Sequence, residues 1–144
     1  MALRQFIPLG LLAFATAGLA QDFPKLGPWE KYGGAPSGTE ITPAALPQQF
    51  LGEWNNPLSA CGTGRSDMRL IIRKDSISFW ESDGEVKRVM RHNDRAVTVL
   101  ATYSGEGQTW DRIDRLVLSR SGNEMTATSG KVSATRYRCP AELD

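Results

Sequence analysis

The sequence predicts an all-β fold: a small antiparallel up-and-down barrel of about eight strands, preceded by an extended N-terminal arm. Two observations indicate this fold. Short runs of alternating apolar residues recur about every ten residues from Phe50 onward, and turn-forming residues separate them. In addition, no run of about ten or more residues has a convincing helical repeat of apolar positions.

Residues 1–20, MALRQFIPLGLLAFATAGLA, have the layout of a secretory signal peptide. A basic residue precedes an apolar run, and Gly18 and Ala20 are the small residues expected at positions −3 and −1 of the cut. A membrane anchor is the alternative, but Pro8 interrupts the run, which is shorter than the ~20 residues that span a bilayer. We therefore expect cleavage near Ala20 and a secreted or periplasmic protein with no membrane span.

Cleavage would leave residues 21–144, which is 124 residues (144 minus 20) and fits one domain. The signal peptide contains one Arg and no acidic residue, so 16 basic residues (17 minus 1) face 16 acidic ones. Nucleic-acid-binding proteins usually have a clear basic excess. We therefore do not expect a nucleic-acid partner.

Cys61 and Cys139 are the only two cysteines. In an exported protein they are expected to form a disulfide bond, which would stabilise the fold by about 4 kcal/mol through the long loop that it closes. A metal site is the alternative, but His92 is the only histidine and a structural zinc site needs four ligands. We expect no metal and no other cofactor.

Residues 21–47 contain five prolines and four glycines, and they are expected to form an extended arm. Within the arm, Thr42 and Pro43 could start a short helical turn, with Thr as the N-cap. Three aromatic residues stand out because the arm cannot build its own core: Phe23, Trp29 and Tyr32. They either pack on the barrel or anchor a binding partner.

The barrel domain is expected over residues 48–144. Its first five strands are expected at 50–56, 67–74, 75–80, 84–92 and 95–103. Asp83 and Gly84 are expected to form a two-residue hairpin turn, because both residue types tolerate a positive φ.

The last three strands are expected at 109–120, 123–129 and 131–139. The first of them is ambiguous, because Trp110, Ile113 and Val117 also have helical spacing. We favour a strand with a bulge or bend near 111–114. The alternating charges of 111–115 are interpreted as an exposed, salt-bridged surface.

The segment Phe50-Leu51-Gly52-Glu53-Trp54 resembles the first strand of lipocalin or calycin barrels, which carries Gly-x-Trp after a short helical turn. The resemblance implies a calycin-like barrel whose closed end is sealed by Trp54, with Arg136 or Arg138 packed over the indole ring. It also implies that Gly52 permits a close approach of the backbone. The alternative is a core Trp in another β fold. The small size is similar to that of secreted bacterial inhibitors of proteases or lysozymes.

The expected disulfide places a demand on the topology. In a simple barrel, Cys61 after the first strand and Cys139 after the last strand would lie at opposite ends, about 20 Å apart. The Cα atoms of a disulfide lie within about 7 Å of each other. Residues 55–66 must therefore fold back, with Asn56-Pro57 as the turn, or the number of strands is odd.

We expect no catalytic activity. His92 is the only candidate imidazole base, and it precedes an Asn-Asp turn where a solvated histidine is the simpler reading. The leading hypothesis is a binding protein that acts like an inhibitor on a protein partner such as a hydrolase. A lipocalin-like carrier of a small apolar ligand and a hydrolase that uses His92 are the alternatives. A large internal pocket would favour the carrier, and a solid interior with an exposed apolar patch would favour the inhibitor.

Overall fold

The computed structural model describes Trp29 and residues 34–141. The described residues form nine strands and two short 3₁₀ helices. The strands are β1 (Thr39–Ile41), β2 (Gly52–Asn55), β3 (Leu70–Ile72), β4 (Ser76–Ser78), β5 (Asp83–Asn93), β6 (Ala96–Gly105), β7 (Gln108–Leu118), β8 (Glu124–Ser129) and β9 (Val132–Arg138). The 3₁₀ helices are η1 (Gln48–Phe50) and η2 (Leu58–Ala60).

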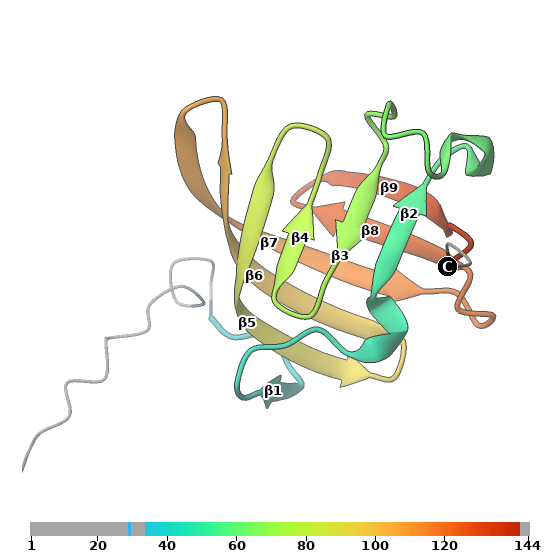
Figure 1. Ribbon diagram of the computed structural model, residues 1–144. Helices are drawn as coiled ribbons and strands as arrows, with labels where there is room; N and C mark the ends of the chain where they lie inside the picture. The colour runs from blue at the N-terminus through green and yellow to red at the C-terminus, as the bar shows by residue number, and fades with distance from the viewer. Residues whose placement is uncertain (1–28, 30–33, 142–144) are drawn as a thin grey trace, which may run out of the picture.

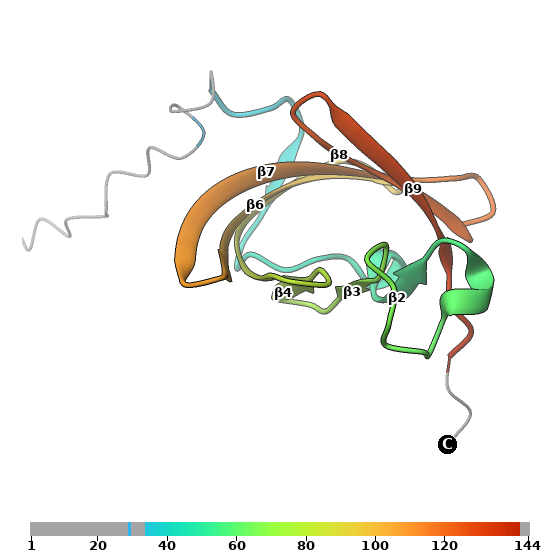
Figure 2. The same ribbon diagram turned by 90° about the horizontal axis from the view of Figure 1, so that it is seen from above.

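Strands β2 to β9 form a closed antiparallel up-and-down barrel, which confirms the predicted fold class (Figures 1 and 2). Each strand pairs with the next along the chain, and the barrel closes where β9 pairs with β2. The closing register places Trp54 opposite Arg138 and Asn55 opposite Tyr137. Because a closed barrel has no free sheet edge, every one of these strands has a partner on both sides.

Strand β1 was not expected, because it lies in the Pro- and Gly-rich arm. It pairs with β5 through Thr39, Glu40 and Ile41, beyond the part of β5 that pairs with β4. The two side-chain oxygens of Glu40 accept hydrogen bonds of 2.6 and 2.7 Å from Arg88. Residues 39–41 are too few to show a strand periodicity in the sequence, so only their pairing with β5 reveals this strand.

The expected helical turn at Thr42-Pro43 is wrong. In residues 34–51, the helical turn before the barrel is η1, five residues later, and its first hydrogen bond runs from the Phe50 N–H to the Pro47 carbonyl at 3.0 Å. Thr42 and Pro43 form a bend, and the peptide bond between them is cis.

Two other local expectations are also corrected. Asp83 and Gly84 lie inside β5 and not in a turn. The Tyr103 ring explains the glycine, because a Cβ at Gly84 would lie 2.5 Å from that ring. Strand β7 is a regular strand, neither bulged nor helical, and pairs with β6 without interruption. The irregular registers are in β5, between Val86 and Arg88 and again near its end.

The barrel interior is filled by apolar side chains that alternate along the strands. The largest of those that are fully buried are Trp54, Tyr103, Phe50, Leu70, Ile72, Ile77, Leu116 and Met125. A second, smaller cluster, outside the barrel, contains Trp29, Met90 and Leu100, with Ile113 packed against it. Among the described residues there is no apolar helix of the length that a bilayer crossing needs.

Candidate functional site

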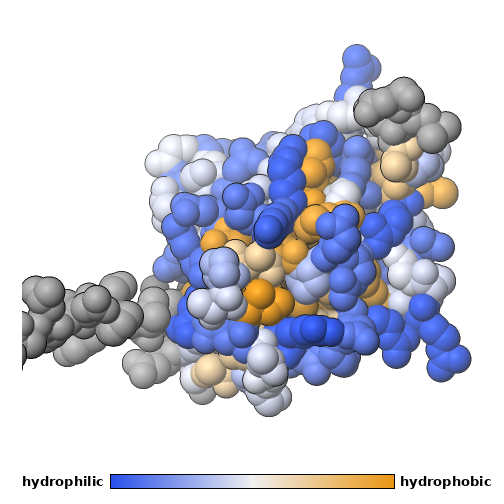
Figure 3. Space-filling model, turned by 60° about the horizontal axis from the view of Figure 1, so that its bottom comes forward, coloured by the Kyte–Doolittle hydropathy of each residue, from blue (hydrophilic) through white to orange (hydrophobic). Residues whose placement is uncertain are grey.

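The closed end of the barrel is sealed by Trp54 and Arg138. The Arg138 Cζ atom lies 4.2 Å from the centroid of the Trp54 ring, and the indole Nε1 donates a hydrogen bond of 2.9 Å to the Phe50 carbonyl. The same guanidinium donates to the carbonyls of Gln49, Leu51 and Gly122, at 2.5, 3.0 and 3.1 Å. Burial lowers the pKa of Arg138. The hydrogen bonds to these carbonyls offset part of the free-energy cost of burying its charge. Figure 3 brings this end forward and shows apolar surface only in small areas between hydrophilic side chains.

The structure separates the two arginines that sequence reasoning treated as equivalent. Arg138 packs on Trp54, whereas Arg136 lies two residues nearer the other end of the barrel, 5.7 Å from the centroid of the Phe79 ring. Gly52 has a φ of 123°, which favours glycine. A Cβ there would lie 3.8 Å from Arg138, an ordinary contact, so backbone conformation and not close approach explains this glycine.

The predicted disulfide is present, and the chain does fold back to form it. After β2, residues 56–69 form the β2–β3 loop, which contains η2 and returns Cys61 to the end of β9. The Cα atoms of Cys61 and Cys139 are 5.5 Å apart. This resolves the topological demand with eight barrel strands and no odd strand.

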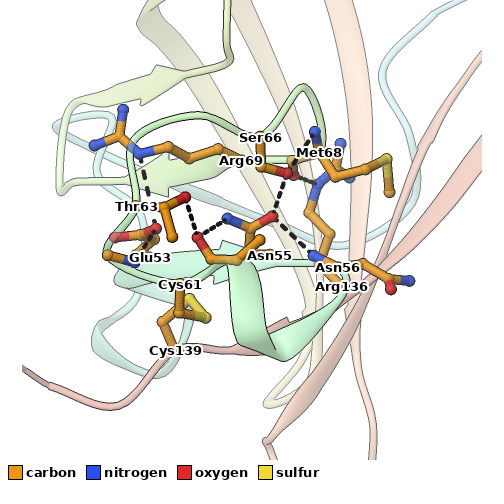
Figure 4. Close-up of a disulfide and its surroundings, with 12 residues drawn as sticks. Glu53, Asn55, Asn56, Cys61, Thr63, Ser66, Met68, Arg69, Arg136 and Cys139 are labelled. Carbon is orange, nitrogen blue, oxygen red and sulfur yellow. Dashed lines mark hydrogen bonds and ion pairs between the residues drawn. A yellow bond between two sulfur atoms is a disulfide. The ribbon is translucent and has the colours of Figure 1, made fainter.

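Asn55 holds the β2–β3 loop from below, as Figure 4 shows. Its fully buried side chain donates to the Ala60 carbonyl at 3.2 Å, and its Oδ1 accepts from the Asn56 N–H at 2.9 Å and from the Ser66 hydroxyl at 2.7 Å. One amide side chain thus ties both arms of the loop together.

Three further contacts fasten the loop to the barrel wall. The Asn56 side chain donates to the Thr135 carbonyl at 3.0 Å on β9, and Arg136 Nε donates to the Met68 carbonyl at 2.5 Å. Glu53 accepts a bond of 3.2 Å from the Gly62 N–H. Residues 57–59 and 62–65 are nevertheless exposed, and Leu58 has half of its surface accessible. The loop is therefore fixed at its base and open to solvent at its surface.

The opposite, open end of the barrel contains a charged cluster in its interior. Asp114 is buried, accepts a hydrogen bond of 2.6 Å from the Tyr103 hydroxyl and pairs with Arg112 Nε at 3.0 Å. The Arg112 guanidinium packs on two rings, 4.1 Å from the Tyr103 centroid and 4.5 Å from that of Phe79. Burial, reinforced by Asp114, raises the pKa of Tyr103, so its hydroxyl stays protonated and donates.

This cluster corrects the surface interpretation of 111–115. Arg112 and Asp114 share the inward parity of Trp110, Leu116 and Leu118, and they lie inside the barrel. The parity signal was present in the sequence, but the charges argued for an exposed face. The buried ion pair of Arg112 and Asp114 depends on the Phe79 ring and on the ring and hydroxyl of Tyr103. These groups come from the segment after β4 and from β6.

A cavity of about 130 Å³ lies beside this cluster. Its polar lining is Arg112, Asp114, Ser129 and Arg136, and its apolar lining is Phe79, Ala127, Val132 and Ala134. Arg136 is almost completely buried, with 5% of its surface exposed, and burial lowers its pKa. Sequence reasoning missed this cavity, because its lining comes from three strands, β7, β8 and β9, and from Phe79 after β4.

Large apolar side chains are exposed at the same end. Trp80 follows β4, Trp110 follows the β6–β7 turn and Val132 follows the β8–β9 turn, with exposed fractions of 44%, 37% and 71%. In an up-and-down barrel these three connections lie at one end, as does the β2–β3 loop (Figure 1). We call this end of the barrel, with the β2–β3 loop, the open rim.

Of the three aromatic residues of the arm, only Trp29 is among the described residues. Its ring is buried against Met90 and Leu100, and the Arg88 Cζ atom lies 5.6 Å from the ring centroid. Trp29 therefore packs on the barrel and is not an exposed anchor. Phe23 and Tyr32 lie outside the described residues.

His92 lies in β5, not in a turn, and its Nε2 is 2.7 Å from the Thr98 hydroxyl. The described residues contain no group of three or more His, Cys, Asp or Glu side chains that could hold a metal ion. Comparisons of the chain with protein-family models, with curated proteins and with solved structures give no match.

Proposed function

We propose that this chain is a secreted or periplasmic binding protein without catalytic activity, and that it inhibits a protein partner, a hydrolase. The observation that carries the proposal is the β2–β3 loop: exposed at its surface, yet fastened by a disulfide and by the buried Asn55. Binding loops on rigid scaffolds lose little conformational entropy when they bind, which raises affinity.

The rest of the open rim supports a macromolecular partner. Trp80 and Trp110 are exposed at the same end of the barrel as the loop, and tryptophan is enriched among the residues that dominate protein interfaces. The predicted export signal and the disulfide are consistent with a partner outside the cytoplasm.

A lipocalin-like carrier is the second candidate, and cavity size argues against it. Ligand pockets usually have volumes of about 300–1,000 Å³. The cavity inside the barrel is about 130 Å³, because large side chains fill the interior. A hydrolase that uses His92 would need a carboxylate to orient the imidazole ring. Among the described residues, the ring contacts the Thr98 hydroxyl and no carboxylate.

The test is inhibition of a panel of secreted hydrolases, with peptidases of each catalytic class and peptidoglycan hydrolases. The proposal expects stoichiometric inhibition of at least one enzyme. It also expects weaker inhibition by Leu58→Ala and Trp110→Ala, while Val117→Ala, similarly exposed at 37% but near the closed end, acts like the wild type. Full inhibition by both rim variants, or inhibition of none of the enzymes, would contradict the proposal.

A further inference from the structure

In the described part of the chain, a single hydrogen bond holds the guanidinium of Arg136. Arg136 Nε donates to the Met68 carbonyl, but in the described part of the chain neither Nη atom has a hydrogen-bond partner. A guanidinium offers five N–H donors and keeps its charge in proteins. Arg136 is 5% exposed, and its terminal N–H groups have no protein acceptor. These donors can therefore bind an acceptor that the chain does not supply.

The charge balance of the cavity defines the sign of that acceptor. Arg112 and Arg136 both line the cavity and both lie within 6 Å of the Phe79 ring centroid, at 4.5 and 5.7 Å. Asp114 is the single acidic residue in the lining, and it pairs with Arg112. One positive charge is therefore not balanced within the lining, which suits a monoanion.

Size and wall chemistry narrow the ligand further. About 130 Å³ corresponds to roughly four water molecules in the liquid, so only a group of a few non-hydrogen atoms fits. Phe79, Ala127, Val132 and Ala134 make the rest of the wall apolar, which suits methylene groups behind the charged end. Planar guanidinium groups bind planar carboxylates with matched, paired hydrogen bonds.

We infer that the cavity between Arg112 and Arg136 is a binding site for a carboxylate on a short aliphatic chain, which the Nη atoms of Arg136 hold. Two sources have this chemistry: a free short-chain carboxylic acid, and the side chain of a Glu or Asp inserted by a protein. The carboxylate site can be tested independently of the proposed inhibition of a hydrolase, so a negative result for one proposal does not contradict the other.

The experiment uses the mature, disulfide-bonded chain labelled with ¹⁵N, and follows the arginine Nε–H signals by NMR during titration with propionate. We expect saturable shifts of the Arg136 and Arg112 signals with a Kd on the order of millimolar, as suits a ligand of so few atoms. Propionamide, which has the same shape without the charge, should leave both signals in place.

Two variants are used, so that the test still decides the question if one of them folds poorly. Arg136→Gln removes the fork, and Ala134→Leu keeps both arginines but fills the cavity. Both should abolish the saturable shifts, whereas Arg120→Gln, an exposed arginine after β7, should not. A capped glutamate, N-acetyl-Glu-amide, replaces propionate in a second arm. Binding of both ligands indicates that a protein side chain can be the source, and binding of propionate alone indicates a free acid.

Three results would overturn the inference: no saturable shift up to about 100 mM propionate, an equal response to propionamide, or unchanged binding by folded Ala134→Leu.

Discussion

The guanidinium of Arg138 lies over the indole ring of Trp54, with its Cζ atom 4.2 Å from the ring centroid. The two residues face each other across the seam between β2 and β9, where the barrel closes. Arg138 also binds three carbonyls of η1 and of the segments beside it, so one side chain joins the seam, the start of the barrel and the β7–β8 loop.

Arg138→Ala should lower the free energy of unfolding by about 2–4 kcal/mol, because it removes the ring contact and leaves carbonyls without their donor. Arg138→Lys should recover little of this, because an ammonium group cannot reach several carbonyls as a planar fork does. Urea unfolding followed by tryptophan fluorescence measures the effect. The control is Arg120→Ala at an exposed position, with an expected change below about 0.5 kcal/mol. A similar small change for Arg138→Ala would refute this role.

Loss of the disulfide should destabilise the folded chain by about 4 kcal/mol, because the bond joins residues 78 positions apart. The measurement is urea unfolding with and without reductant. A Cys61→Ser/Cys139→Ser double variant should match the reduced protein and no longer respond to reductant. Equal stability of the oxidised and reduced wild type would show that the crosslink contributes nothing.

Gly84→Ala should destabilise the barrel by about 1–3 kcal/mol, because the new methyl group would lie 2.5 Å from the Tyr103 ring. The ring cannot easily move, since its hydroxyl binds Asp114 and its face stacks on Trp110 at 6.1 Å. In a Tyr103→Val background the same substitution should cost much less, which a double-mutant cycle measures. An unchanged cost in that background would mean that the ring is not the obstacle.

The ion pair of Glu40 and Arg88 should make the docking of β1 dependent on pH. Its hydrogen bonds to Arg88 lower the pKa of Glu40 below the ordinary value of about 4.3, so the stabilisation is fully present above that pH. It is lost as the pH falls through the folded-state pKa. Because Glu40 is partly exposed, we expect Glu40→Gln to cost no more than about 1 kcal/mol at pH 7.

Thermal unfolding of both proteins between pH 7 and pH 2.5 tests this. The difference between wild type and Glu40→Gln should shrink toward zero at the acidic end. A difference that stays constant over the whole range would show that ionisation of Glu40 is not its source.

Much of the barrel was predictable because the strand signal is local. Alternation of apolar residues located most of the barrel strands, and the Gly-x-Trp segment located the first. The distance limit on the disulfide required either a fold-back after Asn56-Pro57 or an odd number of strands, and the fold-back is present. The misses have a common cause: they depend on contacts between distant segments. β1 exists because β5 is long enough to pair with it, and Gly84 is explained by a ring on β6.

The candidate site was less predictable than the fold. Trp54 and the disulfide were identified, but the inward position of Arg112 and Asp114 was not, because charges are seldom placed in a core. Parity within β7 was the available signal. The separate roles of Arg136 and Arg138 depend on which rings lie above them, which no local pattern encodes.

The most direct test of the proposed function is hydrogen–deuterium exchange of the chain alone and in complex with a hydrolase that it inhibits. We predict slower exchange in the complex over residues 57–65 and 79–82 of the open rim, and no change over residues 119–123 at the closed end. Protection confined to the closed end, with an unchanged β2–β3 loop, would contradict the account.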